Sequence, residues 1–300
     1  MKKILVFGTG FLAKNIFSNC KSNDYIISIS KENSFAFSNK HYKSDFANFK
    51  KIISILKSEK VNQIFFFLGP TFPSNSFKNS KNDLDTYLLS FLHILESSSK
   101  LNVENFVMLS SAGTIYGSEQ KIKYQEDKTI HQENAYGIIL QTMESFLVLY
   151  AKTLGFSYNI FRLSNVFGQF HESSANGFIN IAIRKTLNGE TVSLYNSSIE
   201  KNYIFAYDVA VIFWKLIEKI NKNEVINISS DDNLSLNDIY FKISKQLSTI
   251  KIKKIPLDIK YDTKHTLISN EKLKKLINFE FTSFDKALIK TIEWEQKKIK

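Results

Sequence analysis

The first residues whose spacing points to chemistry are two glycines near the start of the chain, in ILVFGTGFLAKNI. Gly8, Gly10 and Ala13 form the pattern G-x-G-x-x-A between an apolar run and a helical pattern. Gly8 permits a tight turn, Gly10 lets backbone amides approach a pyrophosphate, and Ala13 lets the helix pack closely on the strand. Phe11 and Leu12 open this helix, whose N-terminus faces the anion. The pattern predicts a dinucleotide-binding turn, and a plain strand-to-helix turn is the alternative.

The residues after the second apolar run bear on which dinucleotide is bound. NAD is usually held by an acidic side chain at the end of the second strand, which accepts from the ribose 2′-hydroxyl. Here Ile29 is followed by Ser30 and Lys31. A hydroxyl and a cation suit a 2′-phosphate better than a 2′-hydroxyl. The sequence therefore predicts NAD or NADP as the cofactor and slightly favours NADP. The alternative is that both are exposed loop residues.

Short apolar runs alternate with helical patterns through the first two-thirds of the chain. The predicted strands are 4–7, 25–29, 63–68, 105–109 and 158–163, and the predicted helices are 11–20, 49–58, 84–96 and 137–151. Such alternation implies a parallel sheet with helices on both faces. The predicted fold class is therefore α/β, a Rossmann-like doubly wound parallel sheet.

The alternation loosens after Gly168. Strands are predicted at 191–195 and 225–228, and helices at 178–187, from an Asp208 cap to 219, at 234–247, and from a Ser283 cap to 294. No repeat or low-complexity linker separates the two parts, so a smaller C-terminal substrate lobe is expected to interleave with the sheet. The predicted dinucleotide-binding domain is 1–167 with about 200–222, and the predicted lobe is 168–199 with 223–300.

The composition limits the classes of function. The 300 residues are 43% hydrophobic, enough for a substantial core, and the single cysteine excludes a disulfide framework and fits a reducing compartment. The net charge is +11, but only two of the 40 basic residues are arginines and the lysines are scattered, unlike a nucleic-acid surface. No apolar run is long enough to target or span a membrane. We expect a cytoplasmic protein with no nucleic-acid or membrane partner, whose charge favours an anionic small substrate.

Five ordered segments resemble one protein family. They are the glycine turn, SSAGTIYG at 110–117 with ENAYGIIL at 133–140, FRLSNVFG at 161–168, IEKNYIFAYDVA at 199–210, and KLKKLINFEFTSFDKALIKTIEW at 272–294. Together they resemble the extended short-chain dehydrogenase/reductases, the NAD-dependent epimerase/dehydratase family that modifies nucleotide sugars. The resemblance covers nearly the whole chain. It implies a dinucleotide cofactor and a nucleotide-sugar substrate.

The resemblance implies a catalytic tyrosine at Tyr136. In this family a tyrosine phenolate removes a proton from a sugar hydroxyl while hydride passes to the nicotinamide. A serine or threonine hydroxyl holds the same oxygen. Its usual position falls on Ala112, so Thr114 is the favoured candidate and Ser111 the other. The lysine that lowers the pKa of the tyrosine would stand four residues after it, where this chain has Leu140.

Leu140 changes what Tyr136 can do. A tyrosine with an unperturbed pKa near 10 is only about 0.1% phenolate at pH 7. Leucine cannot lower that pKa by charge, and an apolar neighbourhood is expected to raise it. Tyr124 and Lys128 form another Tyr-x-x-x-Lys in a polar stretch. That spacing is expected by chance in a lysine-rich chain, and it stays an alternative.

Further positions match cofactor contacts of the family. Asp45 and Phe46 resemble the pair beside the adenine, where the carboxylate accepts from the exocyclic amine; a turn aspartate before a core phenylalanine is the alternative. Gly69 follows the fourth strand, where the backbone lies against the cofactor, or it forms a simple loop turn. Ser110 follows the next predicted strand and is also expected to contact the cofactor.

The expected substrate contacts are Asn165, Lys201 and Arg184. Asn165 matches the asparagine that contributes to nucleotide-sugar binding, and Lys201 stands where the family usually has an arginine on the diphosphate, although an ammonium is a weaker clamp. Arg184, on the predicted helix 178–187, is a second clamp or else an exposed helix residue, whereas Arg162, inside a strand, is predicted to be structural. The five histidines share no ligand spacing, so no metal is predicted.

The resemblance implies an NAD(P)-dependent enzyme acting at a sugar carbon of a nucleotide-activated sugar in polysaccharide biosynthesis, a 4-epimerase or a 4-keto reductase. A dehydratase fits less well, because dehydratases of the family usually carry Asp-Glu where Gly113 and Thr114 stand. Leu140 and Ala112 motivate the alternative, an NAD(P)-binding protein with little or no turnover, such as a sensor or partner subunit. The helix 137–151 is apolar nearly all round, which predicts a homodimer or else burial within one subunit.

Overall fold

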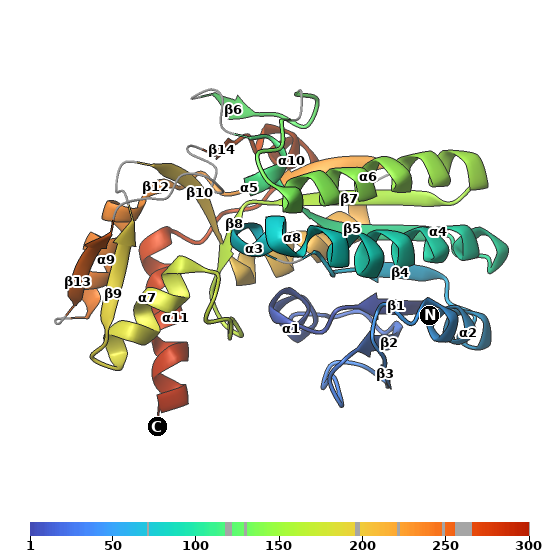
Figure 1. Cartoon of the computed structure of the whole chain (residues 1–300), viewed down its shortest axis with the longest axis horizontal. Helices are drawn as coiled ribbons and strands as arrows, with labels where there is room; N and C mark the ends of the chain where they lie inside the picture. The colour runs from blue at the N-terminus through green and yellow to red at the C-terminus, as the bar shows by residue number, and fades with distance from the viewer. Residues whose placement is uncertain are drawn as a thin grey trace.

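A seven-stranded parallel sheet forms the centre of the protein, in the order β11-β7-β5-β4-β1-β2-β3 (Figure 1). The structure is a computed structural model that describes residues 1–70, 72–117, 122–128, 131–195, 199–220, 223–247, 250–255 and 266–299. The strands of this sheet are β1 (Lys3–Phe7), β2 (Tyr25–Ser30), β3 (Lys40–Lys43), β4 (Gln63–Phe66), β5 (Asn105–Ser111), β7 (Ser157–Leu163) and β11 (Glu224–Ile228). The strand order reverses between β1 and β4, which is the point where such sheets bind ligands.

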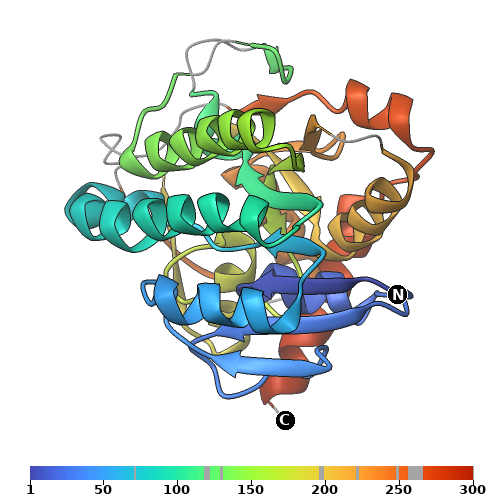
Figure 2. The ribbon, with the colours of Figure 1, turned by 90° about the vertical axis from the view of Figure 1, so that its right-hand side faces the viewer.

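Helices cover both faces of the sheet. One face carries α2 (Phe49–Glu59), α4 (Ser90–Lys100) and α6 (Ala135–Leu154), and the other carries α1 (Phe11–Ser18) and α8 (Ala206–Lys219). Figure 2 shows α4 and α6 side by side over the sheet. The predicted fold class, a Rossmann-like doubly wound parallel sheet, is confirmed.

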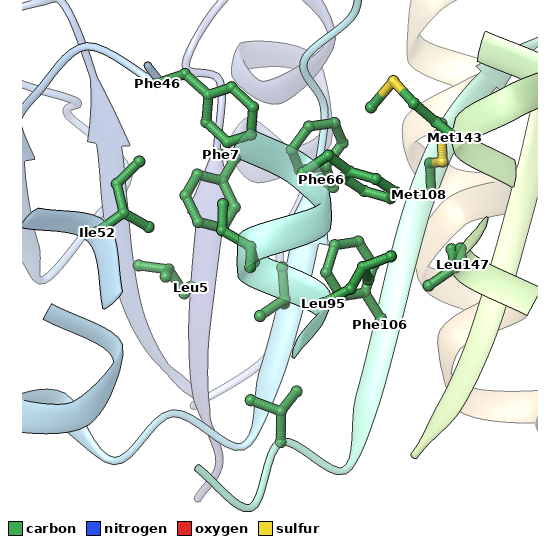
Figure 3. Close-up of a cluster of buried hydrophobic side chains, with 14 of the residues drawn as sticks. Leu5, Phe7, Phe46, Ile52, Phe66, Leu95, Phe106, Met108, Met143 and Leu147 are labelled. Atoms are coloured by element: carbon green, nitrogen blue, oxygen red, sulfur yellow. The ribbon is translucent and has the colours of Figure 1, made fainter. Parts of the chain in front are cut away.

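The two faces bury different side chains, because successive strand residues point to opposite sides. Leu5 and Phe7 of β1 belong to the cluster under α2, α4 and α6, which also contains Met108 and Met143 (Figure 3). Ile4 and Val6 belong to the cluster under α1 and α8. A continuous apolar run therefore fits a strand that is buried on both sides.

The helix predicted at 84–96 is the middle of a longer helical segment. It begins with α3 (Pro73–Asp83), passes through a π-helical turn, η1 (Leu84–Leu89), and ends with α4. The prediction missed α3 because its sequence, PSNSFKNSKND, is polar and has no apolar periodicity. Packing of α3 against α6 supports the helix instead.

A smaller lobe lies at one end of the sheet, on the left of Figure 1. Its core includes Phe167, Ile183, Val192 and Leu288. Outside the main sheet the strands are β6 (Lys123–Tyr124), β8 (Asn165–Phe167), β9 (Thr191–Tyr195), β10 (Glu200–Phe205), β12 (Asn233–Ser235), β13 (Lys251–Ile255) and β14 (Leu267–Ile268), and the remaining helices are α5 (Ala112–Ile115), α7 (Phe178–Leu187), α9 (Leu236–Gln246), α10 (Glu271–Leu276) and α11 (Phe284–Ile299).

The lobe interleaves with the sheet domain, but two strands lie on the other side of the predicted boundaries. β11 falls within 223–300, yet it pairs with β7 at the edge of the main sheet. β10 falls within 200–222, yet it pairs with β8 and β12 in a separate three-stranded sheet. Long-range strand pairing decides both placements, and local sequence does not report it.

Two helix starts also differ in detail from the sequence prediction. Asp208 does not cap α8, which begins at Ala206; its carboxylate accepts from the backbone and the hydroxyl of Thr282, at 2.8 and 2.7 Å. α9 begins later than predicted, behind a capping box formed by Ser235 and Asp238. Among the described residues, no helix has the length and apolarity needed to cross a membrane.

Candidate active site

The predicted site residues follow the carboxyl ends of neighbouring strands. Gly8 follows β1, Ser30 ends β2, Gly69 lies beyond β4, Ser111 ends β5, and Asn165 lies beyond β7. Because parallel strands end at the same edge of a sheet, these residues share one edge, at the point where the strand order reverses.

The glycine turn leaves room for a pyrophosphate. Gly8 has φ +88°, and a Cβ there would lie 3.2 Å from the backbone carbon and oxygen of Phe67, so a side chain would be strained and crowded. A Cβ on Gly10 would meet nothing within 4 Å. Gly10 precedes the first turn of α1, where Phe11 and Leu12 lie. A tight turn, open space and a helix N-terminus together fit a dinucleotide pyrophosphate.

The adenine end of the predicted cofactor site contains an ion pair that the sequence did not indicate. Lys31 and Asp45 had separate predicted roles, but Lys31 Nζ lies 2.8 Å from Asp45 Oδ2. This hydrogen bond lowers the pKa of Asp45 and raises that of Lys31. Both side chains are exposed, so the pair can open at little cost in free energy. Ser30 Oγ accepts from Thr9 Oγ1 at 2.8 Å, which ties the end of β2 to the glycine turn.

An aromatic residue that the sequence analysis missed also lies at this end. Tyr87, in the π-helical turn η1, stacks on Phe46 with ring centroids 6.1 Å apart. Burial raises the pKa of the Tyr87 hydroxyl. The nearby charges act in opposite directions: Lys31 lowers this pKa and Asp45 raises it. Only the irregular helix brings Tyr87 here, because π-helical turns shift the register of the helix faces. No local sequence signal reported this placement.

Tyr136 lies in the first turn of α6, and two features fix it there. The side chain of Asn134 caps the helix by accepting from the Gly137 amide at 2.9 Å. Gly137 lets the helix dock closely, since a Cβ there would lie 2.7 Å from the Thr114 carbonyl oxygen. The phenol hydroxyl lies 3.5 Å from the position that a Cβ on Gly69 would take. Tyr136 is thus placed against the loop after β4 and beside the Thr114 segment.

No charge within the described ranges activates Tyr136. Burial raises the pKa of Tyr136 to about 12, and no charged group opposes the shift. Leu140, one helical turn later, is 1% exposed and belongs to the apolar cluster with Ile139 and Met143. The predicted direction of the pKa shift is confirmed. With a pKa of about 12, about one Tyr136 in 100,000 is ionised at pH 7.

Several hydroxyls at the same edge have no partner. Thr114 Oγ1, Ser110 Oγ and Ser164 Oγ are buried and form no hydrogen bond with the described residues. The Ser111 hydroxyl and the Asn165 amide flank Gly113, within 3.9 Å of the position that a Cβ on that glycine would take. Buried polar groups are usually hydrogen-bonded, so a cluster without partners marks where a ligand supplies them.

The three predicted substrate residues are not equally close to this cluster. Asn165 Nδ2 donates to the carbonyl of Asn202 at 2.9 Å, and Lys201 lies next to Asn202 in β10, paired with Leu234. Arg184 is neither exposed nor free: its guanidinium lies 3.0 Å from Glu295 Oε1 and donates to two backbone carbonyls. A diphosphate would have to displace these partners to reach Arg184.

A second buried tyrosine lies close by in sequence but in a different environment. Tyr116 accepts from Arg162 Nη1 at 2.7 Å and donates to Asn227 Oδ1 at 2.8 Å. Arg162 is 5% exposed and pairs with the buried Glu144 at 2.7 Å, which confirms its predicted structural role. Tyr124, the alternative catalytic tyrosine, is buried and stacks on Tyr116, with ring centroids 5.3 Å apart.

Comparison with known proteins identifies the family. A model of the NAD dependent epimerase/dehydratase family matches residues 4–229. The chain belongs to this family. A putative UDP-glucose 4-epimerase of Methanocaldococcus jannaschii is 25% identical over 247 residues, covering 80% of both chains. GDP-6-deoxy-D-talose 4-dehydrogenase of Aggregatibacter actinomycetemcomitans is 24% identical over 298 residues, covering 94% of both.

Solved structures of epimerase/dehydratase type share the fold. UDP-glucose 4-epimerase of Thermotoga maritima, solved with UDP-glucose, superposes with a TM-score of 0.90 at 22% identity, covering 99% of this chain and 100% of that one. UDP-glucose 4-epimerase of Thermus thermophilus, solved with NAD, has a TM-score of 0.90 at 17% identity, covering 98% and 99%. The predicted family and fold are confirmed, and the family is NAD-dependent and acts on nucleotide sugars.

Proposed function

We propose that the protein catalyses NAD(P)-dependent oxidoreduction at a sugar carbon of a nucleotide-activated sugar, as a 4-epimerase or a 4-keto reductase. One observation carries the proposal. The Tyr136 hydroxyl and the partnerless Thr114 hydroxyl lie at the sheet edge where the Gly8–Gly10 turn is open to a dinucleotide. A hydride cofactor and an acid–base phenol at one edge are the two elements that such a reaction needs.

The cofactor site is assigned to the residues at this edge. Gly8, Gly10, Phe11 and Leu12 would hold the pyrophosphate, and Ser110, Gly69 and Tyr136 would border the nicotinamide end. Ser30, Lys31, Asp45 and Phe46 would hold the adenosine. NADP would be favoured if Lys31 leaves Asp45 and pairs with the 2′-phosphate of the cofactor. When bound, the dinucleotide supplies or accepts the hydride.

The substrate is assigned to the opposite side of the same cluster. Asn165 and Lys201 would contact the nucleotide sugar, and Arg184 would contribute only by leaving Glu295. Thr114, with Ser111 as the second candidate, would hold the sugar oxygen through a hydroxyl. Because Tyr136 rests as a phenol, it is poised to donate a proton to a sugar carbonyl, whereas taking a proton from a sugar hydroxyl first requires the phenol to ionise.

A second candidate function rests on the two unusual positions. Ala112 and Leu140 are both buried, and neither supplies the polar group that the family uses there. A chain that binds NAD(P) and a nucleotide sugar without turnover, as a sensor or partner subunit, would share every other feature of the site.

One experiment separates the two candidates. Purified protein is incubated with a panel of UDP-, GDP- and dTDP-sugars and their 4-keto forms, with each nicotinamide dinucleotide. Reduction is followed at 340 nm and by product mass, and epimerisation by chromatography that separates the C4 epimers. We expect turnover that falls by about 10²–10⁴-fold in Tyr136→Phe while dinucleotide affinity is kept. Dinucleotide binding without turnover across the panel would instead support the binding protein.

The assembly and the setting are also proposals. Ile138 and Leu149 of α6 are 51% and 54% exposed, so the helix is not fully buried within one subunit and has apolar surface for a second copy. A homodimer through α6 is proposed on this basis, and sedimentation equilibrium tests it. Scattered lysines and a single free cysteine, Cys20, are consistent with a cytoplasmic protein without nucleic-acid or membrane partners.

A further inference from the structure

A cavity of about 490 Å³ is formed by residues other than those assigned to cofactor and sugar. The end of α1, the loop after β8, the start of α8 and the helix α11 line it. None of its lining residues is among those predicted for the active site. Its size is in the range of cavities that bind small molecules.

Aromatic rings form one wall of this cavity. Phe170 and Trp294 both line it, with ring centroids 4.6 Å apart, and Tyr207 lines it from the first turn of α8. Phe170 has φ +63°, a left-handed conformation that a bulky residue rarely adopts, so the backbone is strained where it carries this ring. Such a wall offers a planar ligand an aromatic contact surface.

The same wall holds a hydrogen-bond donor without an acceptor. Trp294 Nε1 is buried and finds no partner within the part of the chain that the structure describes. Buried indole N–H groups usually have an acceptor, and leaving one unpaired costs about 1–3 kcal/mol. A ligand that brings an oxygen to this donor would remove that cost.

Two lysine ammonium groups make the cavity cationic. Lys290 and Lys297 line it from α11, and neither forms an ion pair with a described carboxylate. Lys290 Nζ lies 5.6 Å from the centre of the Tyr207 ring. Glu293, the single acidic residue of the lining, leaves a net charge of one positive unit. An anion between the two lysines would gain charge-assisted hydrogen bonds.

We propose that this cavity is a second ligand site, which binds an aromatic phosphate. Its planar ring packs against Phe170 and Trp294, whose rings are inclined at 59° to each other, and its phosphate is held by Lys290 and Lys297. Nucleotides belong to this chemical class. A neutral sugar lacks the charge that the lysines favour, and a metal ion would meet one carboxylate and two cations. The proposal does not depend on the function proposed for Tyr136.

The test uses 4-nitrophenyl phosphate, which carries both parts of the predicted ligand. Calorimetric titration is expected to show saturable binding at this site. The change Lys290→Ala with Lys297→Ala should weaken it at least tenfold, whereas the matched pair Lys275→Ala with Lys286→Ala, exposed lysines outside the cavity, should leave it unchanged. Inorganic phosphate and 4-nitrobenzyl alcohol, each with one part only, should bind at least tenfold more weakly.

Trp294 gives an independent readout of the location. The protein has two tryptophans, so binding should quench fluorescence in the wild type, and the quenching should be largely lost in Trp294→Phe. Probe binding should be unchanged in Gly10→Val, which blocks the turn assigned to the dinucleotide. The proposal is overturned if no saturable binding appears, if both lysine pairs weaken binding equally, or if Gly10→Val weakens it, since that would place the probe in the dinucleotide site.

Discussion

Tyr116 and Tyr136 are both largely enclosed tyrosines whose pKa burial raises to about 12, yet their surroundings differ in kind. The Tyr116 hydroxyl has two partners, Arg162 and Asn227, and Arg162 is itself held by Glu144. The Tyr136 hydroxyl has no hydrogen-bond partner in the described ranges, and the nearby Thr114 hydroxyl has none either.

The difference separates structure from function within one protein. A buried polar network in which every member is paired stabilises the fold and leaves nothing for a ligand. Buried hydroxyls without a hydrogen-bond partner, next to an open glycine turn, reduce stability unless a ligand forms hydrogen bonds with them. The Tyr116 network therefore supports the sheet edge, and the Tyr136 cluster is the part of that edge to which we assign the proposed chemistry.

The largest effect is expected from breaking the Tyr116 network at its charged centre. Arg162→Ala leaves Glu144, 4% exposed, without its cation, and should lower the free energy of unfolding by about 3–5 kcal/mol. Denaturant unfolding followed by circular dichroism measures this. Lys31→Ala, which breaks an exposed ion pair, is the control and should cost about 1 kcal/mol or less. A loss as small as the control's in Arg162→Ala would contradict the structural role of the network.

A paired substitution compares the two tyrosines directly. Tyr116→Phe strands the hydrogen-bonding groups of Arg162 and Asn227 and should cost about 1–3 kcal/mol of unfolding free energy. Tyr136→Phe removes a hydroxyl that has no partner, so stability should change by less than about 0.5 kcal/mol. Equal losses in the two variants would show that Tyr136 has a structural partner in the folded protein.

The smallest effect concerns the missing ammonium near Tyr136. Since burial keeps Tyr136 protonated up to a pH near 12, oxidation of a sugar alcohol should rise about tenfold per pH unit from pH 7 to 10, while ketone reduction stays level. Leu140→Lys should lower the pKa by about 1–3 units, move this rise to lower pH, and increase turnover at pH 7 by roughly tenfold. Leu140→Met keeps the volume and is the control. Identical pH profiles for the two variants would show that a missing ammonium at position 140 does not limit the ionisation of Tyr136.

The parts of the fold that depend on local pattern could be predicted from sequence. The glycine turn, the strands β1 and β2 and the helices α2 and α7 follow from apolar runs, helical spacing and turn residues. The polar helix α3 and the π-helical turn that positions Tyr87 could not be predicted, because packing against α6 stabilises them rather than local propensity.

The site residues divide in the same way. Positions at strand ends, such as Gly69 and Ser111, could be placed because parallel strands end at one edge. Side-chain partners could not, since Asp208 pairs with Thr282, Lys31 with Asp45, and Arg184 with a residue 111 positions away. Such contacts are set by tertiary structure, and the spacing of residues along the chain does not report them.

The central claim, that the Gly8–Gly10 turn grips a dinucleotide pyrophosphate, is tested most directly by calorimetric titration of NAD and NADP into the wild type and Gly10→Val. A Cβ at Gly10 would meet nothing within 4 Å, so the variant should fold within about 1 kcal/mol of the wild type. It would occupy the space assigned to the pyrophosphate. We predict one dinucleotide bound per wild-type chain and an affinity at least 100-fold weaker in Gly10→Val. A wild type that binds neither dinucleotide, or a variant that binds as tightly, would contradict the account.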